Sequence, residues 1–123
     1  MSNAASDKSR PLGLLSFDVE EHCQIEASRG AICPEDWPRW SGRIERNVDW
    51  LLQTLADHDA RATFFLLGYV ARHRPWIVRE IAAAGHEIAC HGYAHDRLHR
   101  LSPSQLSADL AAARAAIEDQ TQQ

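Results

Sequence analysis

Hydrophobic residues in this chain form both short continuous runs and longer stretches with helical spacing. The short runs span residues 12–17, 62–67 and 86–90, and their length predicts three buried strands. Elsewhere apolar residues recur three or four positions apart, which is typical of one face of a helix. This spacing predicts helical segments from residue 41 to about 57–59, and at 69–73, 75–84 and 103–117.

Several of these helices carry capping residues at their ends. We expect Ser41 to be the N-cap of the first long helix. Pro75 suits the first position of the next long helix and Gly85 its end. Ser102 and Gln105 have the spacing of a capping box for the last helix. Because strands alternate with helices, we predict an α/β fold with a parallel sheet and right-handed crossovers.

Composition narrows the class of protein. The 123 residues suffice for one domain, and the net charge of −4 with scattered basic residues argues against nucleic acid as a partner. Three cysteines without a C-x-x-C spacing predict a reducing compartment. No apolar run has the length of a signal peptide core or a membrane span, so we expect a cytoplasmic location. We assign residues 1–11 to a flexible tail and 12–123 to the domain.

An acidic cluster follows the first predicted strand. Asp18 and Glu20 are two positions apart, so in an extended segment both side chains point the same way, while Val19 packs behind them. Two adjacent carboxylates raise each other's pKa unless a cation separates them. One of the two would then bind a metal ion and the other would act as a base. The alternative is an acidic strand end that faces solvent.

A pair of histidines follows the third predicted strand. His91 and His95 are four residues apart and lie on the same side of a turn, where they can share a metal ion such as zinc. Such pairs also cap helices or line surfaces. The carboxyl ends of parallel strands meet at one edge of a sheet, which favours a common site with the acidic cluster. The pattern therefore suggests metal-assisted hydrolysis.

The connection at residues 21–40 is long and irregular, which is uncommon unless the loop is functional. It contains Trp37 and Trp40. Beside a site these two side chains would stack on sugar rings; the alternative is that they anchor the loop to the body of the protein.

Three segments together resemble a known family. Residues 18–26, 62–68 and 85–95 are similar to the polysaccharide deacetylase family, the NodB-homology domain. The first segment resembles the subgroup with a D-V-E-D-Y-type motif from exosortase-associated exopolysaccharide loci. The resemblance implies a distorted β/α barrel. It also implies removal of acetyl groups from an N-acetylated polysaccharide or oligosaccharide with the help of a divalent metal, zinc or another.

The resemblance also implies roles for individual residues. Asp18 corresponds to the general base, and His91 and His95 to the two histidine ligands of the metal. Glu20 takes the place of the family's metal-binding aspartate, with Glu21 as the rival carboxylate. The backbone N–H of Tyr93 is a candidate donor to the oxyanion.

The chain departs from the family pattern after its last predicted helix. Only three strands are expected, about half of the barrel, and the later motifs that carry an arginine-proline segment and the histidine acid for the leaving amine are missing. We therefore expect a truncated domain that is inactive alone. We expect it either to self-associate through its open barrel edge or to be only marginally stable. The alternatives are a non-catalytic metal-binding or interaction module, and an amidohydrolase acting on another linear or cyclic amide.

Overall fold

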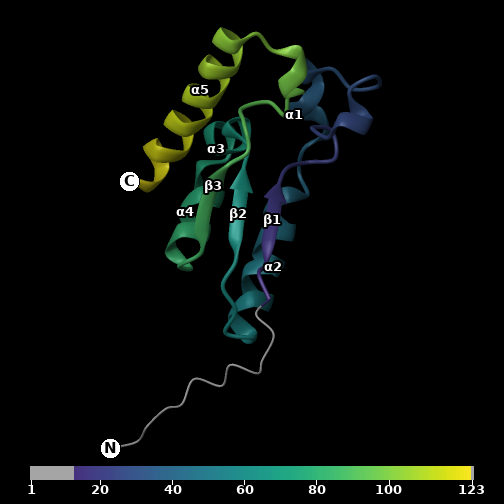
Figure 1. Ribbon diagram of the computed structural model, residues 1–123. Helices are drawn as coiled ribbons and strands as arrows, with labels where there is room; N and C mark the ends of the chain where they lie inside the picture. Colours follow the sequence, from purple (N-terminus) through teal and green to yellow (C-terminus); the bar gives the residue numbers. More distant parts are fainter. Residues whose placement is uncertain (1–12, 123) are drawn as a thin grey trace, which may run out of the picture.

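The computed structural model describes residues 13–122, so the tail assigned to residues 1–11 lies outside the described part. Three parallel strands form one sheet in the order β1-β2-β3. Their bounds are Ser16–Val19 for β1, Thr63–Leu66 for β2 and Glu87–Cys90 for β3. The predicted parallel sheet is confirmed, and the carboxyl ends of all three strands lie at its upper edge in Figure 1.

Helices cover one face of this sheet. The helices α2 (Ile44–Asp57), α3 (Gly68–His73) and α4 (Pro75–Ala83) lie behind the strands in Figure 1. The last helix, α5 (Pro103–Thr121), packs against α3 and α4. Within the described residues no helix covers the opposite face of the sheet, so that face remains open.

Alternation along the strands explains why the two faces differ. Phe64 and Leu66 of β2 are fully buried and pack toward the helices, where the core also takes Ile77 and Ile81 from α4. The side chains at the alternate positions of the strands point to the open face. Across the three strands these are mostly polar: Ser16, Asp18, Thr63, Phe65, Glu87 and Ala89.

Two predicted helix ends are confirmed, and two other boundaries are wrong. The Ser102–Gln105 capping box is present, and Gly85 follows α4 with a φ of +79°. The first strand lies at 16–19 instead of 12–17, because its pairing with β2 determines where the ladder runs. Ser41 does not cap α2: its hydroxyl donates to the Pro38 carbonyl.

The long connection after β1 is folded into short helical turns. It contains η1 (Glu26–Ser28), η2 (Pro34–Asp36) and α1 (Trp37–Trp40), and a further turn, η3 (Leu98–Arg100), precedes α5. The connection lies above the carboxyl ends of the strands in Figure 1. It is therefore placed to contribute to a site at that edge.

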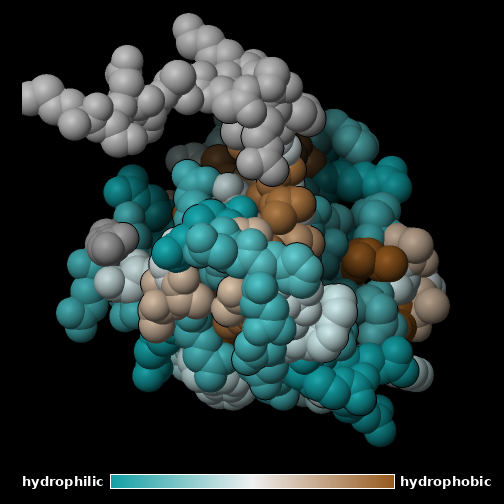
Figure 2. All heavy atoms as spheres, turned by 90° about the horizontal axis from the view of Figure 1, so that it is seen from below, coloured by the Kyte–Doolittle hydropathy of each residue, from teal (hydrophilic) through white to brown (hydrophobic). Residues whose placement is uncertain are grey.

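The opposite end of the sheet is shown from below in Figure 2. Hydrophilic residues cover most of this view, with a few hydrophobic ones between them. Among residues 13–122, no helix combines the length and the apolar character needed to cross a bilayer.

Candidate metal centre

The acidic and histidine motifs converge at the carboxyl edge of the sheet. Glu20 directly follows β1, and His91 directly follows β3. Backbone bonds fix the histidine segment: the His91 amide donates to the Leu66 carbonyl at 2.9 Å, and the Gly68 amide donates to the Gly92 carbonyl at 2.9 Å. The turn that carries the histidines is thus tied to the end of the central strand.

Three side chains form a compact set of donor atoms. Glu20, His91 and His95 each offer one ligand atom, and these atoms all lie within 4.8 Å of one another. His95 Nε2 and Glu20 Oε2 lie 3.3 Å apart. Ligand atoms bound tetrahedrally about 2.1 Å from zinc lie about 3.4 Å apart, so small side-chain movements would bring all three onto one ion.

The hydrogen bonding of these side chains is incomplete. Glu20 Oε2, His91 Nε2 and His95 Nδ1 are buried atoms without a hydrogen-bond partner among the described residues. Buried polar atoms are normally paired, so unpaired atoms at one place need an explanation. Two imidazoles and one carboxylate make up a ligand set of catalytic zinc sites, with the fourth position left to water. The residues present therefore fit a divalent metal ion.

Asp18 lies beside this set on the open face of the sheet. Its Oδ2 is 3.7 Å from His91 Nε2, and its side chain is 54% exposed. Val19 is buried behind it, as the strand alternation predicts. Asp18 is therefore accessible to water and close to the place where the three donor atoms meet.

Glu21 is engaged at the start of α2 and is not one of the three grouped donors, so its role as the rival ligand stays a prediction. Its Oε1 accepts hydrogen bonds from the backbone N–H groups at the start of α2, those of Gly42, Arg43 and Ile44. Burial raises the pKa of Glu21, but these three donors outweigh it, and the pKa lies below its usual value. This carboxylate is a helix cap.

Two further predicted residues, Tyr93 and Trp37, are engaged elsewhere in the structure. The Tyr93 amide donates to Asp109 Oδ2 at 3.0 Å, so it would have to leave this acceptor to bind an oxyanion, and that role stays a prediction. Trp37 is only 2% exposed and packs edge-on against Tyr69, with ring centroids 4.8 Å apart. It anchors the loop, which was the alternative reading, and has no face free for a sugar.

Trp40 differs from Trp37 in its exposure. Its side chain is 53% exposed, and its ring lies edge-on to His22 with centroids 6.2 Å apart. A role in substrate stacking therefore stays a prediction for Trp40 alone.

A hollow of about 490 Å³ opens beside the two histidines and is also lined by Asp109 and Leu110. Its volume falls in the range of small-ligand sites.

Comparison with known proteins places the chain in a family. The sequence profile of the polysaccharide deacetylase family matches residues 31–123. The chain belongs to the polysaccharide deacetylase family. The match covers His91 and His95 and begins after the segment that holds Asp18 and Glu20.

Individual known proteins resemble this chain in sequence or in fold. The chitooligosaccharide deacetylase of Bradyrhizobium sp. (strain ANU 289) is 34% identical over 67 residues, which cover 54% of this chain and 31% of the relative. The structure of the peptidoglycan deacetylase PdaC from Bacillus subtilis has a TM-score of 0.67 at 20% identity, covering 89% of this chain and 44% of that one. The structure of a CE4 family pseudoenzyme from Bacillus anthracis has a TM-score of 0.62 at 26% identity, covering 89% of this chain and 31% of that one.

The chain thus spans less than half the length of these deacetylase-family members. Its strands and helices superpose on part of their barrels, which confirms the prediction of a partial β/α barrel.

Sequence reasoning missed two residues that hold the histidine turn. Asp109 of α5 accepts the Tyr93 amide, and Arg29 donates to the Ala94 carbonyl and to Asp96. Both act across long separations in sequence, and no local pattern marks them.

Proposed function

We propose that this chain is the metal-binding part of a carbohydrate N-deacetylase, which hydrolyses an acetamido group on an N-acetylated polysaccharide or oligosaccharide. The observation that carries the proposal is the convergence of Glu20, His91 and His95, each of which has a buried side-chain atom without a hydrogen-bond partner among the described residues. Membership of the polysaccharide deacetylase family supports the substrate class. The resemblance of residues 18–26 to the exosortase-associated subgroup supports an exopolysaccharide as the polymer.

Each residue of the site would have a separate role. Glu20, His91 and His95 would hold the metal ion, for which zinc fits the donor set. A bound metal would polarise the acetyl carbonyl and lower the pKa of water at the site. Asp18, at 3.7 Å from His91, would accept the proton of the attacking water at its carboxylate. Trp40 would stack on a sugar ring at the rim.

A zinc titration tests the site. We expect calorimetry to give one zinc ion per chain and no detectable binding after His91→Ala together with His95→Ala. His99→Ala is a matched control, because His99 lines the same hollow but is not one of the three donors. Unchanged binding in the double variant would reject the ligand assignment.

A second candidate function is metal binding without catalysis. It is favoured by the likeness to a structure described as a pseudoenzyme, because such a fold can persist without turnover. A measurement of acetate release from acetylated chitooligosaccharides distinguishes the catalytic function from metal binding without catalysis. Since the chain spans less than half of its relatives, we expect little turnover by this chain alone. A longer form that contains the chain should release acetate and lose that activity on Asp18→Asn. A form that binds zinc but releases no acetate would support the second function.

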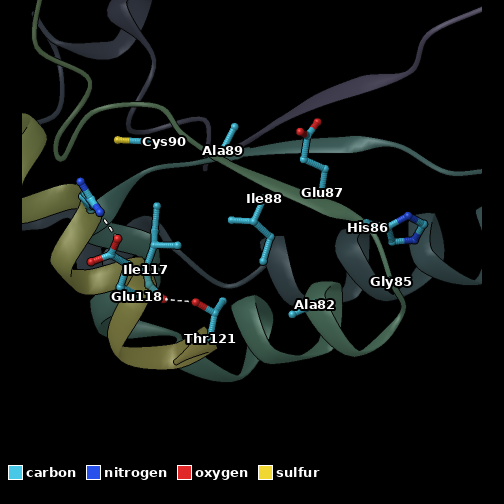
Figure 3. Close-up of a pocket in the computed structure, with 11 residues that line it drawn as sticks. Ala82, Gly85, His86, Glu87, Ile88, Ala89, Cys90, Ile117, Glu118 and Thr121 are labelled. Carbon is cyan, nitrogen blue, oxygen red and sulfur yellow. Dashed lines mark hydrogen bonds and ion pairs between the residues drawn. The ribbon is translucent and has the colours of Figure 1, made fainter. Parts of the chain in front are cut away.

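We also propose that two copies of the chain associate along β3. Within the described residues β3 pairs only with β2, and its outer edge borders a hollow of about 490 Å³ (Figure 3). Figure 3 shows Ile88 pointing toward Ile117 of α5, while Glu87 and Ala89 point to the other face. An unpaired edge with an apolar neighbour favours pairing with another strand.

Sedimentation over a range of concentrations tests this association. Ala82 lines the hollow, so Ala82→Glu should weaken the dimer. Ala83→Glu, on an exposed neighbour outside the hollow, should leave it unchanged. A monomer at every concentration would contradict the proposal.

A further inference from the structure

The backbone of His95 has an unusual conformation. Its φ is +60°, in the left-handed region that side-chain-bearing residues rarely adopt. The same turn contains Gly92 at +75°, where glycine meets no steric penalty. A strained residue persists only when its surroundings hold it. The conformation of His95 therefore needs a cause, and it bears on the site because His95 Nε2 faces Glu20 at 3.3 Å.

Arg29 contacts the residues on both sides of His95. Its Nη2 donates to the carbonyl oxygen of Ala94 at 2.7 Å, and its Nη1 donates to Asp96 Oδ1 at 2.7 Å. Arg29 comes from the loop after β1, 65 and 67 residues away in sequence from these partners. Its side chain is 27% exposed, and its Nε lies 3.4 Å from Glu26. The planar guanidinium can reach both acceptors at once because its N–H groups form a fixed fork.

We propose that Arg29 is a positioning residue that holds the His95 backbone in the left-handed conformation and thereby strengthens metal binding at the site. The first part depends only on the contacts of Arg29. The second part rests on the proposed function. Because Arg29 belongs to the same loop as Glu20, it also joins the two segments that supply the ligands.

The direction in which zinc affinity changes when Arg29 is replaced distinguishes a positioning role from a purely electrostatic one. A guanidinium near a metal site repels the cation, so loss of its charge alone would tighten zinc binding. Loss of positioning would weaken it. Removal of groups that orient metal ligands typically lowers metal affinity about 10- to 100-fold. We therefore expect weaker binding, although a positive charge is removed.

The test compares Arg29→Gln with Arg97→Gln. Arg97 also pairs with Glu26, at 2.6 Å, and lies two residues from His95. Among the described residues, its guanidinium makes no hydrogen bond to the Ala94 carbonyl or the Asp96 carboxylate, the two acceptors of Arg29. Both variants lose one positive charge at the same turn. We expect zinc affinity to fall about tenfold or more in Arg29→Gln and to stay within about twofold in Arg97→Gln. The visible spectrum of bound Co²⁺, which reports ligand geometry, should change only in Arg29→Gln.

A measurement on the metal-free protein separates this inference from the proposed function. NMR of the folded variants reports the φ of His95 through the intraresidue HN–Hα contact, which is short when φ is positive. We expect a positive φ in the wild type and in Arg97→Gln, and its loss in Arg29→Gln. A positive φ retained in Arg29→Gln, or zinc affinity that is unchanged or higher, would overturn the inference. If the wild type bound no zinc, the proposed function would fail, while loss of the positive φ would still uphold the positioning role.

Discussion

The cap that Glu21 provides for α2 can be tested by removing it. Its carboxylate accepts hydrogen bonds from Gly42, Arg43 and Ile44 at 2.8, 3.0 and 3.0 Å, and the side chain is 5% exposed. In Glu21→Ala the buried Ile44 amide loses its acceptor, which costs about 1–3 kcal/mol. The other two amides are partly exposed and recover water, at about 0.5–1 kcal/mol each. We therefore expect a loss of about 3 kcal/mol in the free energy of unfolding.

Urea unfolding followed by circular dichroism measures this loss, which corresponds to a fall in melting temperature of about 12 °C for a domain of this size. Glu21→Gln keeps an acceptor oxygen without the charge and should lose about half as much, because charge-assisted bonds are roughly twice as strong. Glu35→Gln, on an exposed side chain of the same loop, is the control and should change little.

The pH dependence provides an independent check. The folded pKa of Glu21 lies below its usual value of 4.5, so its contribution is present above that pH and is lost as the pH falls through the folded pKa. The stability difference between wild type and Glu21→Gln should therefore be constant near neutral pH and shrink below about pH 4.5. A difference that is absent at pH 7, or that persists unchanged in acid, would refute this account of the cap.

Two further predictions concern packing and thiol reactivity. Gly68→Ala should destabilise the fold by about 1–3 kcal/mol in the same unfolding assay, because an added Cβ would lie 2.5 Å from a ring carbon of Tyr93. Gly30→Ala, with no atom within 4 Å of the added Cβ, should not, and equal losses would contradict the argument. Cys23 is buried, which raises the pKa of its thiol, so a thiol reagent should label it slowly in the folded chain. The exposed thiols of Cys33 and Cys90 should react quickly. Three fast-reacting thiols would contradict the burial of Cys23.

Features that depend on neighbouring residues could be predicted from the sequence. The capping box at Ser102 and the glycine stop at Gly85 need only local contacts, and both are present. The acidic cluster and the histidine pair could be placed at the same edge of the sheet because strands that alternate with helices run parallel. All their carboxyl ends therefore lie on one side.

Features that depend on distant contacts could not be predicted in this way. Ser41 has the local signature of an N-cap, but Glu21 supplies the cap from more than 20 residues away. Trp37 and Trp40 have similar surroundings in sequence, and only tertiary packing decides that the first is buried and the second exposed. The contacts of Arg29 span more than 60 residues and carry no periodic signal.

X-ray absorption at the zinc edge of the one-to-one complex tests the central claim most directly, because it reports the atoms bound to the metal. We predict two imidazole nitrogens at about 2.0–2.1 Å and light oxygen ligands at about 2.0–2.2 Å, with this signal lost when His91 and His95 are both replaced by alanine. A sulfur ligand near about 2.3 Å, or a spectrum unchanged in the double variant, would show that the metal binds elsewhere.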